Sequence, residues 1–118
     1  MTTPTIILVA SLALTAVDGD TVRIGEDGER LRLESIDAPE TGHRADCPSE
    51  AILGDQATHR LTELLPDVVA IEGGEERGGY GRPLVTLRLS DGRTLGEVLI
   101  SEGLAVPWAG RRHEWCAD

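Results

Sequence analysis

The chain has 118 residues, and 40% of them are hydrophobic, which fits one globular domain with a small core. Its formal net charge of −10 argues against a uniformly basic surface for nucleic acid. All eleven cationic residues are arginine, however, and the planar arginine fork suits phosphate oxygens at a local site.

The first predicted elements are β-strands. Residues 6–17 form an apolar run rich in β-branched side chains, and the turn residues 18–20 end it. Strands at 21–24 and 29–36 flank the polar turn 25–28, so these two strands are predicted to form a hairpin.

The apolar run at the N-terminus also bears on localisation. No Lys or Arg precedes it, and it is too short to span a bilayer, so we expect a strand and no membrane association, with a weak signal peptide as the less favoured alternative. The compartment stays open. The missing signal favours the cytoplasm, whereas a disulfide between Cys47 and Cys116 would favour export.

Two helices and two more strands are predicted in the second half. Leucine and alanine at helical spacing predict a long helix over residues 50–65. Strands follow at 68–72 and 84–89, separated by a charged, glycine-rich loop. A short helix at 94–102 is expected to begin at a Thr94 cap and to stop at Gly103.

This order of elements predicts an α+β, mainly β fold. Five strands with one long helix between the third and fourth, and a short C-terminal helix, suggest a five-stranded OB-like β-barrel. We expect a single domain over residues 1–118, with a core at 10–108 and a tail at 109–118. Such barrels present ligands on one face, including single-stranded nucleic acid.

Carboxylates gather at two strand ends. Asp18 and Asp20 flank one glycine, which a plain turn explains equally well, but hard cations prefer such oxygen ligands. Asp37 could join Asp20 on a metal. Glu40 follows a proline turn, and a carboxylate beside a bound water can act as general base. A strand with charged outer positions is the alternative interpretation.

Two arginines extend this set. Arg32 lies in the strand before Asp37, and Arg82 follows a flexible loop, where a surface position is the plain alternative. If the fold brings Arg82 opposite Arg32, the two guanidinium groups could stabilise the charge of a five-coordinate phosphoryl transition state. A cation, two arginines and one base are the groups that attack of water on a phosphodiester requires.

In their order along the chain, these motifs resemble the staphylococcal nuclease (thermonuclease) family. The matching segments are Val17–Val22, Arg32-Leu33 with Ile36–Glu40, Tyr80–Arg82 and Gly103–Ala105. The resemblance implies an OB-like barrel and calcium-dependent cleavage of DNA and RNA.

The resemblance also implies roles for individual residues. The implied calcium ligands are Asp20, Asp37 and the backbone carbonyl of Ala38. The implied catalytic residues are the base Glu40 and the phosphate-binding Arg32 and Arg82. Tyr80 is implied to lie near the nucleotide.

The tail leaves several interpretations open. Trp108 could stack on a base or cap the core, and we slightly favour the cap. Cys47 and Cys116 could form a disulfide, remain free, or bind zinc together with His43 and His113. The disulfide is favoured among these three.

The sequence thus predicts a monomeric, sugar-nonspecific endonuclease that uses Ca²⁺ and acts on DNA, RNA or both. The alternative is a catalytically weak module of the same fold that binds nucleic acid or protein. The presence of the catalytic residue types favours the enzyme.

Overall fold

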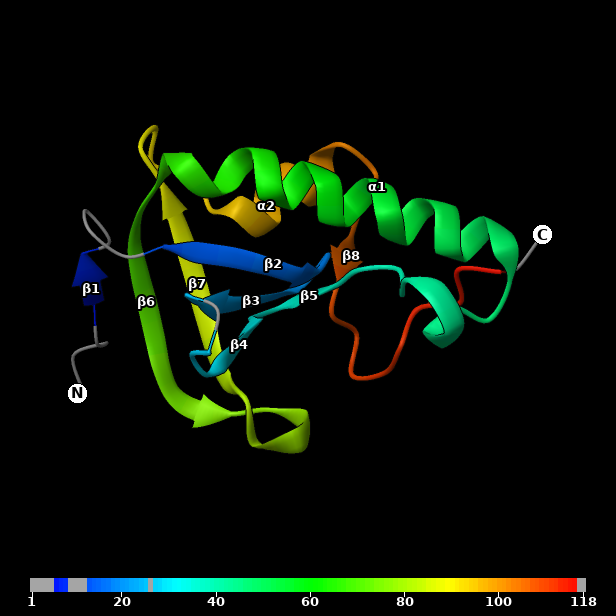
Figure 1. The fold of residues 1–118 in the computed structure, drawn as a ribbon, viewed down its shortest axis with the longest axis horizontal. Helices are drawn as coiled ribbons and strands as arrows, with labels where there is room; N and C mark the ends of the chain where they lie inside the picture. The colour runs from blue at the N-terminus through cyan, green and yellow to red at the C-terminus, as the bar shows by residue number, and fades with distance from the viewer. Residues whose placement is uncertain (1–5, 9–12, 26, 117–118) are drawn as a thin grey trace.

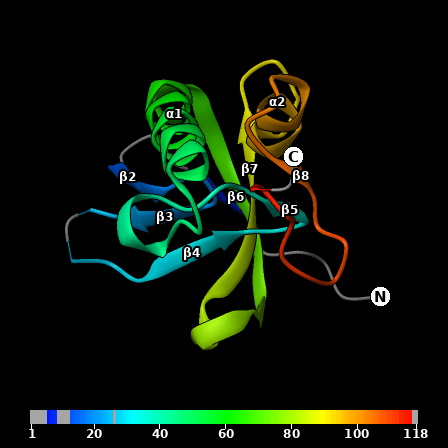
Figure 2. The ribbon, with the colours of Figure 1, turned by 90° about the vertical axis from the view of Figure 1, so that its right-hand side faces the viewer.

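The computed structural model describes residues 6–8, 13–25 and 27–116. The domain is mixed α+β, with a curved sheet and two helices (Figure 1). The strands are β1 (Ile6–Leu8), β2 (Leu14–Asp18), β3 (Thr21–Ile24), β4 (Arg30–Leu33), β5 (Ile36–Asp37), β6 (Val68–Arg77), β7 (Pro83–Leu89) and β8 (Val106–Pro107). The helices are α1 (Pro48–Leu64) and α2 (Leu95–Ser101), which lie side by side on the same side of the sheet (Figure 2).

The main sheet has the strand order β1-β6-β7-β4-β3-β2, and β5 pairs separately with β8. The β4–β7 pair is parallel, and the other pairs are antiparallel. Among the described residues, β1 and β2 are the edges of an open sheet, so the predicted closed five-stranded barrel is not confirmed. The edge strand β2 packs against α1 instead of closing onto another strand.

Two predicted strands are interrupted. The run at 6–17 contains β1 and β2, and its residues 9–12 lie outside the described part of the chain. The strand predicted at 29–36 ends at Leu33, because the chain turns sharply at Ser35, whose φ is 69°. β5 begins directly after this turn and pairs with β8, which the sequence did not predict.

The hairpin of β6 and β7 is longer than expected. The segment predicted as a loop from residue 73 continues β6 to Arg77, where it pairs with Pro83. A register shift lies between Gly73 and Arg77, and Gly73 and Gly74 have φ of 89° and 97°, which only glycine adopts readily. The far end of this hairpin projects away from the helices (Figures 1 and 2).

Both helices lie close to their predicted ranges. α1 begins at Pro48, a favourable first helical residue, and buries Ala57 and Leu61. α2 is capped by Thr94, whose hydroxyl oxygen accepts the Glu97 amide at 3.0 Å. Among the described residues, no helix is long and apolar enough to cross a membrane.

The core between the helices and the sheet is aliphatic, as the composition requires. Its least exposed side chains are Val22, Leu61, Val85, Leu87, Leu89, Leu95 and Leu99. This core holds the ends of β2, β3 and β4 in place, and those ends carry the polar residues of the site described next.

Candidate active site

A broad groove of about 1490 Å³ runs between the ends of the central strands, the β6–β7 hairpin and the C-terminal tail. It contains most of the residues singled out from the sequence, namely Asp20, Arg32, Asp37, Glu40, Tyr80, Arg82 and Trp108. Ala38 lies buried beside them. The fold therefore brings together residues that are far apart in the chain.

The groove is locally rich in arginine although the chain is acidic. The arginines that line it are Arg30, Arg32, Arg44, Arg82 and Arg112. Carboxylates line the same groove, so cationic and anionic groups alternate there. The net charge of −10 therefore does not describe the surface that a phosphate would meet.

Asp20 is the centre of the hydrogen-bond network. Its Oδ2 accepts the Ala38 amide at 3.1 Å, and its Oδ1 accepts the Thr21 hydroxyl at 3.2 Å. The turn that carries Asp20 fits here because of Gly19, where an added Cβ would come within 2.8 Å of the side chains of Ala38 and Ala57. Glycine therefore permits the close approach that positions Asp20.

Both predicted arginines connect to this carboxylate. A terminal nitrogen of Arg32 lies 3.5 Å from Asp20 Oδ2, and its guanidinium also donates to the Leu33 and Ile36 carbonyls at 2.7 and 2.8 Å. Arg82 donates to the Thr21 hydroxyl oxygen at 3.1 Å. Thr21 thus links Arg82 to Asp20.

The carboxylates at the strand ends are buried. Asp18, Asp20 and Asp37 are each no more than 9% exposed. Burial raises the pKa of Asp20 to about 7, with Arg32 opposing the shift and Asp18 adding to it. The site therefore holds more negative charge than its protein partners neutralise.

Glu40 is half-buried at the edge of the groove. Burial and the charge of Asp18 raise its pKa above the ordinary value, whereas Arg112 and Arg44 act in the opposite direction. Its backbone amide donates to Oε2 of Glu50 at 2.9 Å. This hydrogen bond to a side chain of α1 therefore fixes the position of the Glu40 backbone, from which the Glu40 side chain extends.

Asp37 has a partner that the sequence did not suggest. The pairing of β5 with β8 brings the tail alongside, and the His113 amide donates to Asp37 Oδ2 at 2.6 Å. Within the described ranges, no three His, Cys, Asp or Glu side chains converge as a metal-binding group.

Two aromatic side chains are exposed along the groove. Tyr80 is 99% exposed, and the Arg82 guanidinium carbon lies 5.7 Å from its ring centre. Trp108 is 48% exposed, and its amide donates to the Ser35 carbonyl at 2.9 Å. Trp108 is thus more exposed in the groove than we would expect of a side chain that caps the core.

The two cysteines are joined in the structure. Cys47 and Cys116 form a disulfide with their Cα atoms 6.1 Å apart. In this state they are not available to bind zinc with His43 and His113. The bond ties the tail to the residue before α1 (Figure 1).

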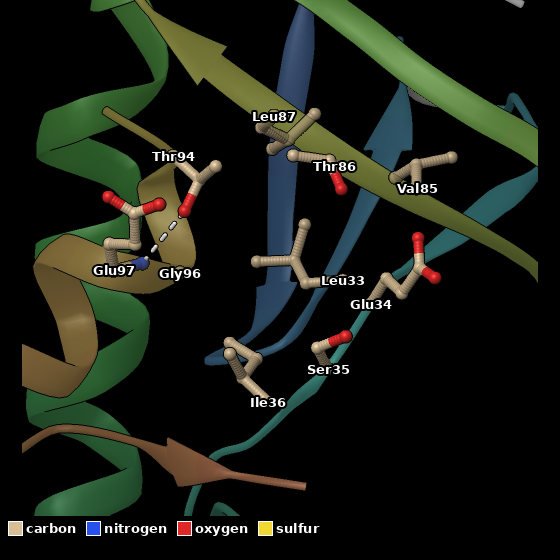
Figure 3. A pocket seen from close by; sticks show the side chains of 10 residues that line it. All are labelled: Leu33, Glu34, Ser35, Ile36, Val85, Thr86, Leu87, Thr94, Gly96 and Glu97. Atoms are coloured by element: carbon tan, nitrogen blue, oxygen red, sulfur yellow. Dashed lines mark hydrogen bonds between the residues drawn. The ribbon is translucent and has the colours of Figure 1, made fainter. Parts of the chain in front are cut away.

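A second, smaller pocket of about 260 Å³ lies between β7, the turn after β4, and α2 (Figure 3). Apolar side chains such as Leu33 and Leu87 line it together with Glu34 and Glu97. The lining has two carboxylates and no arginine, so this pocket is poorly suited to phosphate.

Sequence reasoning assigned no role to three contributors to this network. They are Thr21, Glu50 and Arg112. Glu50 was interpreted only as part of a helix start, and Arg112 only as part of the tail. Pairing Cys47 with Cys116 was the available signal, since it brings Arg112 near the start of α1.

The fold and the groove first define a class of protein: a small α+β domain whose broad groove is lined by arginines and carboxylates. The family model described as staphylococcal nuclease homologue matches residues 30–114, and the chain belongs to this family. The resemblance seen in the sequence is thereby confirmed. The match includes Arg32, Glu40 and Arg82 and begins after Asp20. No curated protein sequence matches the chain significantly.

Proposed function

We propose that this domain is a calcium-dependent endonuclease that hydrolyses phosphodiester bonds of DNA, RNA or both. The observation that carries the proposal is that Arg32 lies beside the Asp20 carboxylate and Arg82 is linked to it through Thr21, in a groove that also contains Glu40. These are the groups that attack of water on a phosphodiester requires. Membership of the staphylococcal nuclease family supports the same reaction.

The oxygen ligands available suit calcium. Asp20 and Asp37 are buried carboxylates, and a carboxylate offers about four acceptor positions, so each retains free ones beside its protein partners. Calcium completes its shell with backbone carbonyls and water, so the Ala38 carbonyl and two carboxylates would suffice without a third acidic ligand. When bound, calcium would supply positive charge that polarises a phosphoryl oxygen and offsets the buried carboxylates.

The protein's own groups account for the remaining steps. Glu40 accepts a proton from water, and the water oxygen adds to phosphorus as the ester P–O bond breaks. The departing oxygen keeps the electron pair of that bond and takes a proton from solvent. Arg32 and Arg82 donate hydrogen bonds to the phosphoryl oxygens as their charge increases. Tyr80 and Trp108 stack on the bases of a single strand.

Cleavage of single-stranded DNA, with calcium and with excess chelator, tests this function directly. We expect Glu40→Gln to lower kcat by about 10²–10⁴-fold, because the general base is removed. Glu63→Gln is a matched control, since Glu63 is a half-exposed residue of α1 outside the groove lining.

Two outcomes would contradict the proposal. Full activity in excess chelator would exclude calcium dependence. Equal rates for wild type and Glu40→Gln would exclude Glu40 as the base.

The second candidate is a nucleic-acid-binding module without turnover. The exposure of Tyr80 and Trp108 along one groove favours binding independently of catalysis. Binding of single-stranded DNA without calcium-dependent cleavage would support this candidate. Because the arginines that could contact phosphates are confined to this groove and the chain as a whole is acidic, we expect few phosphate contacts and a shallow dependence of affinity on salt.

A further inference from the structure

The start of α1 contains a carboxylate that lies wholly inside the protein. Glu50 is 0% exposed, and both of its oxygens accept hydrogen bonds. Oε1 accepts the Asp46 amide at 2.8 Å, and Oε2 accepts the Glu40 amide at 2.9 Å. A buried carboxylate therefore holds the backbone of the proposed general base.

A residue of the tail neutralises this carboxylate. One terminal nitrogen of Arg112 pairs with Glu50 Oε2, and the other donates to Asp46 Oδ2 at 2.6 Å. The Arg112 side chain is 37% exposed and lines the groove beside Glu40. The disulfide between Cys47 and Cys116 ties together the two segments that carry this pair.

Packing leaves the Glu40 backbone little freedom. A Cβ added at Gly54 would lie 2.2 Å from the Glu40 carbonyl oxygen, so α1 and the Glu40 backbone are in direct contact. Glu50 lies one turn earlier on the same helix. If Arg112 were removed, Glu50 would be a buried charge without a cationic partner, which is unfavourable enough to force its side chain to move.

We infer that Glu50 and Arg112 are positioning residues for hydrolysis: Arg112 holds Glu50 in place, and Glu50 holds Glu40 where it can reach the attacking water. This inference rests on the proposed nuclease function. It assigns a role in turnover to a tail residue that lies 62 positions after its partner. Neither residue contacts the substrate in this role.

A double-mutant cycle with Glu40 separates positioning from general damage. We expect Arg112→Met to lower kcat by on the order of 10²-fold with little change in KM, the loss that displacing a catalytic group by about 1 Å produces. In the Glu40→Gln background the same change should alter kcat far less, because the group that Arg112 positions is already disabled. Arg112→Lys should restore part of the loss, since it retains the charge without the fork.

Arg60→Met is the matched control. Like Arg112, Arg60 forms ion pairs through two of its nitrogens, in this case with the single carboxylate of Glu102, but it lies outside the groove lining. This variant should keep the wild-type kcat. An equal fall in kcat for Arg60→Met and Arg112→Met would overturn the inference.

Amide hydrogen exchange gives a second measurement that does not depend on activity. In Arg112→Met the Glu40 amide should exchange faster, while amides of β7 such as Leu87 stay protected. Unchanged protection of the Glu40 amide would overturn the inference. So would an equal kcat loss from Arg112→Met in the wild-type and Glu40→Gln backgrounds. If Glu40→Gln alone has the wild-type rate, the proposed function fails instead, and the two failures are therefore distinct.

Discussion

The two walls of the groove are built in opposite ways. The α1 wall, formed by Glu40, Glu50, Gly54 and Arg112, is held by a buried carboxylate, a close helix contact and a disulfide-linked tail. The hairpin wall, residues 78–82, carries the fully exposed Tyr80 and three glycines. Its Arg82 side chain bonds to the Gly79 carbonyl and to Thr21.

This difference separates two requirements of the proposed reaction. A general base must be placed accurately, which a packed and cross-linked wall achieves. A surface that binds varied nucleotides needs exposed aromatic rings and adaptable backbone, which the hairpin wall provides. Changes in the α1 wall should therefore affect stability and turnover together, whereas changes in the hairpin wall should affect function alone.

The largest expected effect on stability comes from the disulfide. Replacing Cys47 and Cys116 by serine opens a loop of 69 residues and should lower the free energy of unfolding by about 4 kcal/mol through loop entropy. Urea denaturation of both forms measures the difference. Tyr80→Ala in the hairpin wall is the control and should shift stability by less than about 0.5 kcal/mol. Equal unfolding midpoints for the serine variant and the wild type would contradict the comparison.

The next largest expected effects are on turnover, and they distinguish Arg32 from Arg82. Arg82→Ala and Arg32→Ala should each lower kcat by on the order of 10²-fold or more, because each removes a donor to the phosphoryl group. Only Arg32→Ala should also lower Tm, since Arg32 satisfies the Leu33 and Ile36 carbonyls. Thermal unfolding and steady-state kinetics, with Arg93→Ala as a surface control, decide this. A fall in Tm for Arg82→Ala similar to that for Arg32→Ala would contradict the expectation that changes in the hairpin wall affect function alone.

Gly54→Ala tests the contact inside the α1 wall. Alanine in a free helix position would stabilise the protein by about 1 kcal/mol, whereas overpacking against Glu40 should destabilise it by about 1–3 kcal/mol. We also expect kcat to fall, because Glu40 is displaced. Asp55→Ala, at the exposed neighbouring position, should show no such loss. A gain in stability for Gly54→Ala would show that the space between α1 and the Glu40 backbone accommodates a methyl group, and it would contradict this prediction.

The smallest effect concerns the buried charge of Asp20 in the metal-free protein. Its pKa of about 7 exceeds that of an unfolded aspartate, so the folded state binds the proton more tightly. The resulting stability is present at low pH and is lost as pH rises from about 4 through 7. Asp20→Asn should reduce this pH dependence and raise Tm at pH 8 by about 4 °C or more. Identical Tm-versus-pH curves, measured with chelator present, would contradict this.

Local signals in the sequence predicted local structure well. Helical spacing and Pro48 place α1 within two residues of its observed range, and Thr94 and Gly103 mark the ends of α2. The prediction of one strand from 29 to 36 was wrong because the break depends on a positive φ at Ser35, a conformation that serine rarely adopts. The glycines after residue 72 suggest a loop when the sequence is read alone. Pairing with β7 nevertheless extends β6 through them.

The site was predictable to a similar extent and for similar reasons. Residues with a recognisable chemistry and order, such as Asp20, Arg32 and Glu40, were found from the sequence and lie in one groove. Glu50 and Arg112 were not, because their pairing depends on the path of the tail rather than on a nearby pattern. The predicted closure of the sheet into a barrel is not confirmed, since the number of strands alone does not decide which edges meet.

The late position of Arg112 has a consequence for biosynthesis. Every strand and both helices precede it in the chain, so a ribosome completes them before it adds this residue and Cys116. During synthesis, Glu50 therefore has no cationic partner until residue 112 has been added. Under the proposed function, the residues that would bind the phosphodiester are all translated before the residue that is inferred to position Glu40.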